Sequence, residues 1–243
     1  DYDRALQLDP NNPKAYYKRA NVRLVKQDWE GAIADYDAVL RLEPTHALAM
    51  GDRAWAYFQK GDINAALAGC EAALQLNPQL AYVYNNRGII YQSQGELEKA
   101  IAEFDEALRR DPTFLIAWCN RGCARYHQHN YSGSIADHNE TIRLSPQNPH
   151  FYCNRGEAYL ASEVYEGALN DFQKASELEP SFNFATAGLA ITQHALGSTD
   201  EALRLWQTLL EKDARYRDAE WVQQELNWVA PLVDEARKLI ARL

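Results

Sequence analysis

A period of 34 residues constrains this chain more than any other feature of its sequence. Arg19, Arg53, Arg87, Arg121 and Arg155 follow one another at intervals of 34 residues. Prolines keep the same interval, at Pro10, Pro44, Pro78, Pro112, Pro146 and Pro180. So do small residues, at Ala32, Ala66, Ala100, Ser134, Ala168 and Ala202. A fixed period of roughly 20–50 residues is typical of stacked repeat proteins, in which each repeat buries its apolar surface against its neighbours.

Residues 81–114 illustrate what one repeat contains. Apolar and small residues follow helical spacing over 84–91, and Gly95 is suited to the left-handed turn that closes a helix. A second helical pattern covers 97–108, and it ends before Pro112 because proline disfavours helix in the residue that precedes it. The repeat therefore predicts two antiparallel helices, which we call A and B, joined by a tight turn.

The register within the repeat resembles that of the tetratricopeptide repeat family. Counted from residue 81, it carries an aromatic residue at position 4, a small residue at 8, an aromatic at 11, alanine at 20, an aromatic at 24, alanine at 27 and proline at 32. The resemblance implies an all-α fold, an α-solenoid in which antiparallel helix pairs form a right-handed superhelix with its A helices lining a concave groove. Asn-Arg-Gly recurs at 86–88, 120–122 and 154–156, so the chain resembles an Asn-Arg-Gly subtype of this family.

Residues 1–216 are expected to form the repeat array, and residues 217–243 depart from the pattern. The array comprises a partial repeat 1–12 and six full repeats at 13–46, 47–80, 81–114, 115–148, 149–182 and 183–216. Two apolar-patterned stretches in 217–243 predict C-terminal capping helices, with Pro231 near the start of the second, because terminal repeats need a polar outer surface. Cys70 and His138 replace the aromatic residue at position 24, which predicts looser packing of their B helices.

The recurring arginine at position 7 has a candidate partner on helix B. An acidic residue follows sixteen positions later in four repeats, as Asp35, Glu103, Asp137 and Asp171. In the last repeat both are lost together, as Leu189 and Leu205, and the repeat with Arg53 has Gly69 instead of an acid. We interpret the arginines as ties between helices, paired with these carboxylates. The alternative is an arginine ladder in the groove that binds an acidic ligand.

Composition restricts the class of partner and the compartment. The net charge of −9 argues against nucleic acid, which requires a basic surface, and no apolar run approaches the ~18 residues of a membrane span. The four cysteines lack the dense pattern of a disulfide scaffold, so we expect reduced thiols and a cytoplasmic location. The chain begins without methionine, on residues that resemble the end of a repeat, so we expect a fragment. Its first helix pair would then be incomplete and would expose apolar surface, through which we expect self-association.

No catalytic motif, nucleotide loop or zinc-protease signature is present, and we expect neither an enzyme nor a bound cofactor. Cys119, Cys123 and His127 form a stripe along one helix, and Cys153 is the counterpart of Cys119 in the next repeat. Thiolates and an imidazole can bind zinc or copper(I). However, the stripe spans two helical turns, which one ion cannot bridge, so small cysteine side chains that fill a crowded flank are the favoured interpretation and no metal site is predicted.

Two classes of function fit such a chain. The first is a non-catalytic protein–protein interaction scaffold that binds a peptide segment of a partner in the concave groove, as the family resemblance implies. The alternative is a substrate-recognition or regulatory arm of a larger enzyme whose catalytic domain lies outside this chain.

The candidate groove is centred on asparagines at position 6 of three consecutive repeats. Position 6 points away from the core-facing position 8, so Asn86, Asn120 and Asn154 are expected on the concave side. An amide side chain donates and accepts hydrogen bonds together, which suits a peptide backbone. The arrangement resembles the asparagine ladder of O-linked N-acetylglucosamine transferases, although asparagines on an ordinary solvated surface would give the same pattern. Apolar groups expected beside the ladder are Tyr82, Ile89, Ile116, Tyr126 and Phe184.

Overall fold

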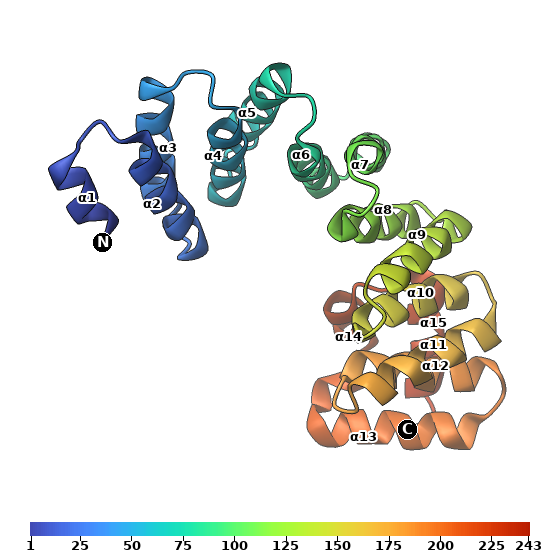
Figure 1. Ribbon diagram of the computed structural model, residues 1–243. Coiled ribbons are helices and arrows are strands. Elements are labelled where there is room, and N and C mark those ends of the chain that lie inside the picture. The colour runs from blue at the N-terminus through green and yellow to red at the C-terminus, as the bar shows by residue number, and fades with distance from the viewer. The chain divides into compact units, whose positions relative to one another are not determined.

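The computed structural model describes residues 1–243 and contains fifteen α-helices, one short 3-10 helix and no strand (Figure 1). The all-α solenoid class predicted from the sequence is confirmed. The helices divide into two compact units, residues 1–117 and 118–243.

The first unit contains α1 to α7, and α8 (Leu115–His127) begins at its end. Its helices are α1 (Tyr2–Leu8), α2 (Pro13–Val25), α3 (Trp29–Leu42), α4 (Ala47–Lys60), α5 (Ile63–Leu76), α6 (Ala81–Ser93) and α7 (Leu97–Arg110). The second unit contains most of α8, followed by α9 (Tyr131–Leu144), α10 (Pro149–Ala161), α11 (Tyr165–Leu178), α12 (Asn183–Ala195), α13 (Thr199–Lys212), the 3-10 helix η1 (Ala214–Arg217), α14 (Ala219–Leu226) and α15 (Ala230–Ile240). The A helices are the even-numbered helices from α2 to α12, and each is followed by its B helix. The division into a 1–216 array and a 217–243 cap stays a prediction.

Each A helix packs against its B helix at a residue with little or no side chain. A β-carbon at Gly88 would lie 2.5 Å from Phe104 Cε1, and one at Gly156 would lie 3.1 Å from Phe172 Cζ. Because the aromatic ring occupies the space of the missing side chain, the two helix axes approach closely. The six small residues at position 20, from Ala32 to Ala202, are all fully buried.

The connections repeat as regularly as the helices. Gly95 adopts the left-handed conformation that closes α6, with φ of 77°, as the sequence predicted. The equivalent position is left-handed in non-glycine residues too, namely Gln27, His129 and Glu163. Several helices are capped by side chains at their N-termini, for example by Asp62, which accepts a hydrogen bond from the backbone of Ala65 at 3.0 Å.

The recurring arginines pair with the carboxylates of their B helices, which confirms the predicted ties. Three of them form two-pronged contacts, and the shortest nitrogen–oxygen distance is 2.6 Å in each of Arg19–Asp35, Arg121–Asp137 and Arg155–Asp171. Arg87 contacts Glu103 through one nitrogen at 2.9 Å. Arg19 and Arg155 also contact Asp3 and Asn139 of preceding helices. Because these guanidinium groups are engaged by neighbouring helices, the alternative of an arginine ladder for an acidic ligand is wrong.

The repeat at 47–80, which has no acidic partner for its arginine on helix B, forms a different ion pair. Arg53 contacts Asp37 of the preceding B helix at 2.5 Å instead of a partner in its own pair. Gly69 occupies the place of the missing acid, and a β-carbon there would lie 2.8 Å from the Ala54 β-carbon. Removal of the acid therefore lets α4 and α5 meet through two small residues.

His138 lies where other repeats have an aromatic ring. Its side chain is buried against Gly122, where a β-carbon would lie 2.7 Å from the ring nitrogen Nε2, so α8 and α9 pack closely rather than loosely. The ring nitrogen Nδ1 has no hydrogen-bond partner. Burial in this apolar setting lowers the pKa of His138 to about 4.

We predict that Gly122→Leu disrupts the pairing of α8 with α9. The new side chain would overlap the His138 ring, and overpacking of this kind costs about 1–3 kcal/mol or more. Urea denaturation measures the loss in the free energy of unfolding, with exposed Asn170→Leu on α11 as the matched control. An unchanged melting temperature for Gly122→Leu would show that Gly122 does not lie at the helix contact.

A second prediction concerns pH. As the pH falls from 6.5 towards 4, the unfolded chain takes up a proton at His138 that the folded chain does not, so the wild-type chain loses stability. His138→Phe removes this contribution and places the usual aromatic ring against Gly122. We expect the stability advantage of His138→Phe to grow between pH 7.5 and pH 5, whereas His129→Asn on an exposed turn should show no such trend.

Candidate peptide-binding surfaces

The A helices of the first unit meet around a tyrosine–aspartate cluster. The Tyr17 hydroxyl on α2 donates to Asp52 on α4 at 2.6 Å, and the Tyr82 hydroxyl on α6 donates to the Leu48 carbonyl of α4 at 3.3 Å. A β-carbon at Gly51 would lie 2.9 Å from the Tyr82 hydroxyl, so the glycine admits the ring. Burial raises the pKa of Asp52, and the hydrogen bond from Tyr17 counters only part of that effect.

Three of the predicted groove residues share one side of α6. Tyr82, Asn86 and Ile89 lie four and three residues apart, and all three are partly exposed, whereas Val83, Gly88 and Ile90 elsewhere on the helix are buried. This side of α6 therefore offers an amide between two apolar groups. Ile116, also predicted for the groove, is 55% exposed.

The asparagines of the second unit lie in a different setting. The Asn154 amide on α10 donates towards two thiol sulfurs of α8, at 3.7 Å from Cys119 and 3.9 Å from Cys123. Asn120 is partly buried on α8. The Asn154 donor group is thus directed at α8, in contacts longer and weaker than an ordinary amide hydrogen bond.

Tyr126 and Phe184 were expected to line the groove, and the structure places both against the C-terminal residues of the chain. Tyr126 is only 5% exposed, and its hydroxyl accepts a hydrogen bond from the Val229 backbone at 3.5 Å. Phe184 meets the Trp228 ring edge to face, with ring centres 6.2 Å apart. The prediction of open groove contacts at Tyr126 is wrong in this structure, because residues that the sequence assigned to an end cap cover it.

The cysteines of the stripe lie on α8, and Cys153 lies on α10. Cys70, Cys119, Cys123 and Cys153 are all free thiols, and no group of three or more His, Cys, Asp or Glu side chains is placed to hold a metal ion. The hydrogen bond between Cys123 and Cys119 lowers the pKa of Cys119 and raises that of Cys123, which burial raises further. His127 is bound instead by Asn227, whose amide lies 3.2 Å from its Nε2.

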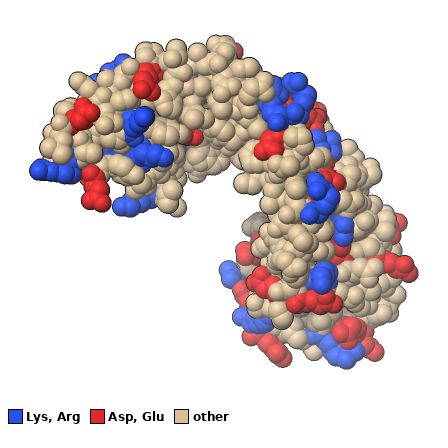
Figure 2. Space-filling view, in the orientation of Figure 1, with Lys and Arg blue, Asp and Glu red and all other residues tan.

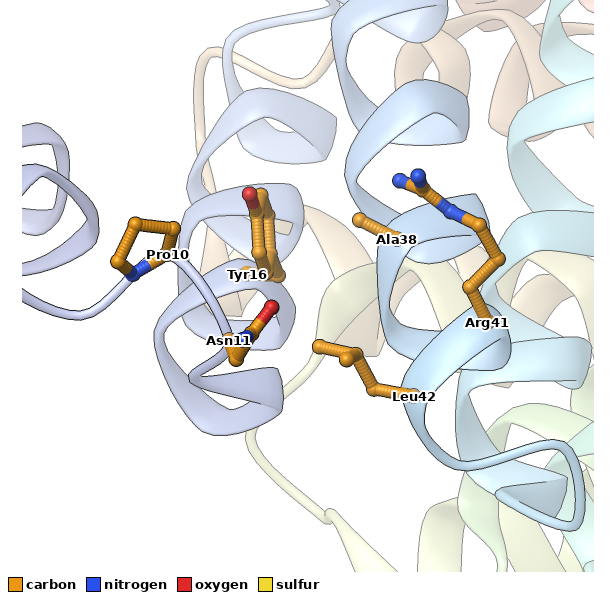
Figure 3. A pocket seen from close by; sticks show the side chains of 6 residues that line it. All are labelled: Pro10, Asn11, Tyr16, Ala38, Arg41 and Leu42. Atoms are coloured by element: carbon orange, nitrogen blue, oxygen red, sulfur yellow. The ribbon is translucent and has the colours of Figure 1, made fainter.

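Neither the cavities nor the surface charges suggest a site for chemistry. A cavity of about 320 Å³ lies beside the α1–α2 connection, with Tyr16 of α2 on one side and Arg41 and Leu42 of α3 on the other (Figure 3). Figure 2 shows basic and acidic side chains interspersed on the visible face of each unit.

At the N-terminal end Leu8 and Val25 are exposed, and self-association there stays a prediction. No helix is both long and apolar enough to cross a membrane.

The sequence matches four family models, all described as tetratricopeptide repeat. They cover residues 53–117, residues 1–45 and 17–81, residues 149–182, and residues 184–208. The chain is therefore a tetratricopeptide repeat protein. No curated protein matches its sequence significantly, and no catalytic family is among the models that match.

Solved structures confirm the tetratricopeptide repeat fold. PilF of Pseudomonas aeruginosa is 17% identical with a TM-score of 0.74, and the match covers 88% of this chain and 97% of PilF. PilW, described as a widely conserved type IV pilus biogenesis factor, is 22% identical with a TM-score of 0.73 over 88% of this chain and 98% of PilW. YrrB, described as a TPR protein with an unusual peptide-binding site, is 20% identical with a TM-score of 0.60 over 76% of this chain and 95% of YrrB.

The partly buried carboxyl of Asp52 makes a testable contribution to stability. Because its folded pKa is raised, the Asp52 contribution is fully present below pH 3.8 and is lost as the pH rises through the folded pKa. Asp52→Asn keeps an acceptor for Tyr17 and removes the charge, so it should raise the free energy of unfolding near pH 8 relative to wild type. Urea denaturation from pH 5 to pH 9 tests this, and exposed Glu71→Gln serves as the control. A lower stability of Asp52→Asn across that range would contradict the assignment.

Proposed function

We propose that this tetratricopeptide repeat protein is a non-catalytic interaction scaffold that binds a peptide segment of a partner protein on its A-helix surfaces. The observation that carries this proposal is the side of α6 with Tyr82, Asn86 and Ile89. These side chains stay partly exposed, whereas Val83, Tyr84, Asn85, Gly88 and Ile90 of the same helix are buried. Hydrophobic contacts flanking a group that both donates and accepts are what an extended peptide requires.

Other tetratricopeptide repeat structures support this class of function. YrrB is described as having a peptide-binding site. A chain of the APC/C hetero-tetramer Cut9–Hcn1 is 19% identical, and the match covers 79% of this chain and 38% of that one. We extend the proposal to Asn120 and Asn154, whose Asn-Arg-Gly triplets define the subtype that we assign to this chain. In each triplet the arginine and glycine serve helix packing, and the asparagine is the residue that we propose for recognition.

The test is a triple variant, Asn86→Ala, Asn120→Ala and Asn154→Ala. A partner is first captured with the wild-type chain, and its binding segment is purified as a labelled peptide. The variant should fold with an unchanged circular dichroism spectrum and bind the peptide at least tenfold more weakly, which corresponds to about 1.4 kcal/mol.

Exposed asparagines on B helices provide the matched control. Asn64→Ala on α5 and Asn170→Ala on α11 remove the same group from a surface that is not proposed to bind. They should leave the affinity unchanged. If the folded triple variant and the Asn64→Ala, Asn170→Ala control bound the peptide with equal affinity, the three asparagines would be ordinary surface residues without a role in binding.

A further inference from the structure

The C-terminal residues do more than close the end of the last helix pair. The 3-10 helix η1 covers α13, where the Trp206 indole donates to the Tyr216 carbonyl at 2.9 Å, and α14 packs on η1 and α15. Asn227 then takes the left-handed conformation, with φ of 52°, and α15 packs on the A helices α10 and α12 (Figure 1). We call residues 227–240 the docked segment.

The docked segment rests on side chains of three successive A helices, which we call the unit 2 face: Tyr126, His127, Glu157, Phe184 and His194. At its start, Asn227 and Val229 contact His127 and Tyr126 of α8. Near its end, Glu235 pairs with His194 of α12 at 2.5 Å. The segment therefore covers the side of the repeats on which the proposed function places a peptide.

The chemistry of the docked segment is that of an amphipathic helix bound in a groove. Trp228 is 3% exposed, and the other buried apolar residues are Leu232, Val233, Ala236 and Leu239. Their spacing of three to four residues places them on one side of the helix, whereas Asp234, Arg237 and Lys238 face solvent. Recognition by this face is thus apolar, and it is centred on one tryptophan.

The fit of the segment to the face is incomplete in two places. Glu157 is 8% exposed beneath Trp228, and the neighbouring groups that face it are Cys123 and Tyr126 of α8 and Cys153 of α10, none of which is cationic. Burial raises the pKa of Glu157, and the Trp228 indole N–H, which makes no close hydrogen bond, lowers it only in part. A cavity of about 350 Å³ also remains between α15 and the ends of α10 and α12, lined in part by Leu160, Ala195 and Lys238.

A buried carboxyl without a cation weakens the docked state relative to a fully packed core, and the open pocket leaves one edge of α15 without contact to α10 and α12. We propose that the docked segment is a resident, displaceable occupant of the unit 2 face, and that the partner of this face is another amphipathic helix with a tryptophan anchor. This inference rests on the proposed function, because it names the kind of segment that one A-helix surface takes. The docked segment competes with the partner helix for the unit 2 face. Because the segment is tethered to the chain, it does so at a high effective concentration.

The experiment uses the full chain and a fluorescein-labelled peptide with the sequence of residues 227–243. In wild type the tethered segment blocks the face, so binding measured by fluorescence polarisation should be weak. Trp228→Ala in the chain removes the anchor of the tethered copy only, and the intact peptide should then bind at least tenfold more tightly. Arg237→Ala, which removes only an exposed local ion pair with Asp234, is the matched control and should bind as wild type does.

Three results would overturn the proposal. The first is a folded Trp228→Ala chain that binds the peptide no more tightly than wild type. The second is a dimer in light scattering that forms on release of the segment and excludes the peptide, because the occupant would then be a second copy of this chain. The third is equal protection of α15 and of α10 to α13 in hydrogen exchange of the wild-type chain, because the segment would then be a fixed part of the core. We expect the amides of α15 to exchange faster, through a local opening. This measurement also tests the proposal if Trp228→Ala fails to fold.

The proposed function and this inference fail separately. The triple asparagine variant leaves Trp228, Glu157 and Phe184 intact, so it does not alter the contacts of the docked segment described here. Conversely, loss of peptide binding to the unit 2 face would leave Tyr82, Asn86 and Ile89 of the first unit available.

Discussion

The close approach of each A helix to its B helix is the constraint on which the rest of this structure depends. An aromatic ring such as Phe104 or Phe172 fills the space above a residue that lacks a side chain, and any β-carbon at Gly88 would overlap the ring. Because glycine or alanine recurs at this position every 34 residues, the contact fixes which side of each helix is buried. The opposite side of the A helices is then free to carry other residues, and that side holds the candidate binding surfaces.

Charge is buried in two different ways in this molecule. In the recurring pairs, a guanidinium from helix A meets a carboxylate from helix B in a two-pronged contact, for example Arg155 with Asp171. Even there, burial outweighs the arginine and raises the pKa of Asp171, so the pair contributes more to the register of the helices than to net stability. Glu157 has no such cation, and it lies where the chain covers its own A helices.

The candidate site was only partly accessible to sequence reasoning. Helical geometry placed Tyr82, Asn86 and Ile89 on one side of α6, because residues three and four apart share a helix face. The same geometry placed Tyr126 on the A-helix side of α8, which is correct for the helix, but could not indicate that Val229 would bury it. The signal that was available lay in Trp228, whose apolar neighbours at 232, 233, 236 and 239 are patterned for burial against something larger than one helix end.

The sequence by itself determined the fold class, the helix pairing, the left-handed turn at Gly95 and the arginine–carboxylate ties, because each depends on contacts between residues at fixed and short separations. Only the tertiary structure decided that His138 packs as closely as an aromatic ring, that Arg53 turns to Asp37, and that the C-terminal helix lies on α10 and α12. These outcomes depend on which surfaces compete for the same side chain. The Val229–Tyr126 contact joins residues 103 positions apart, and no periodicity in the sequence encodes such a pairing.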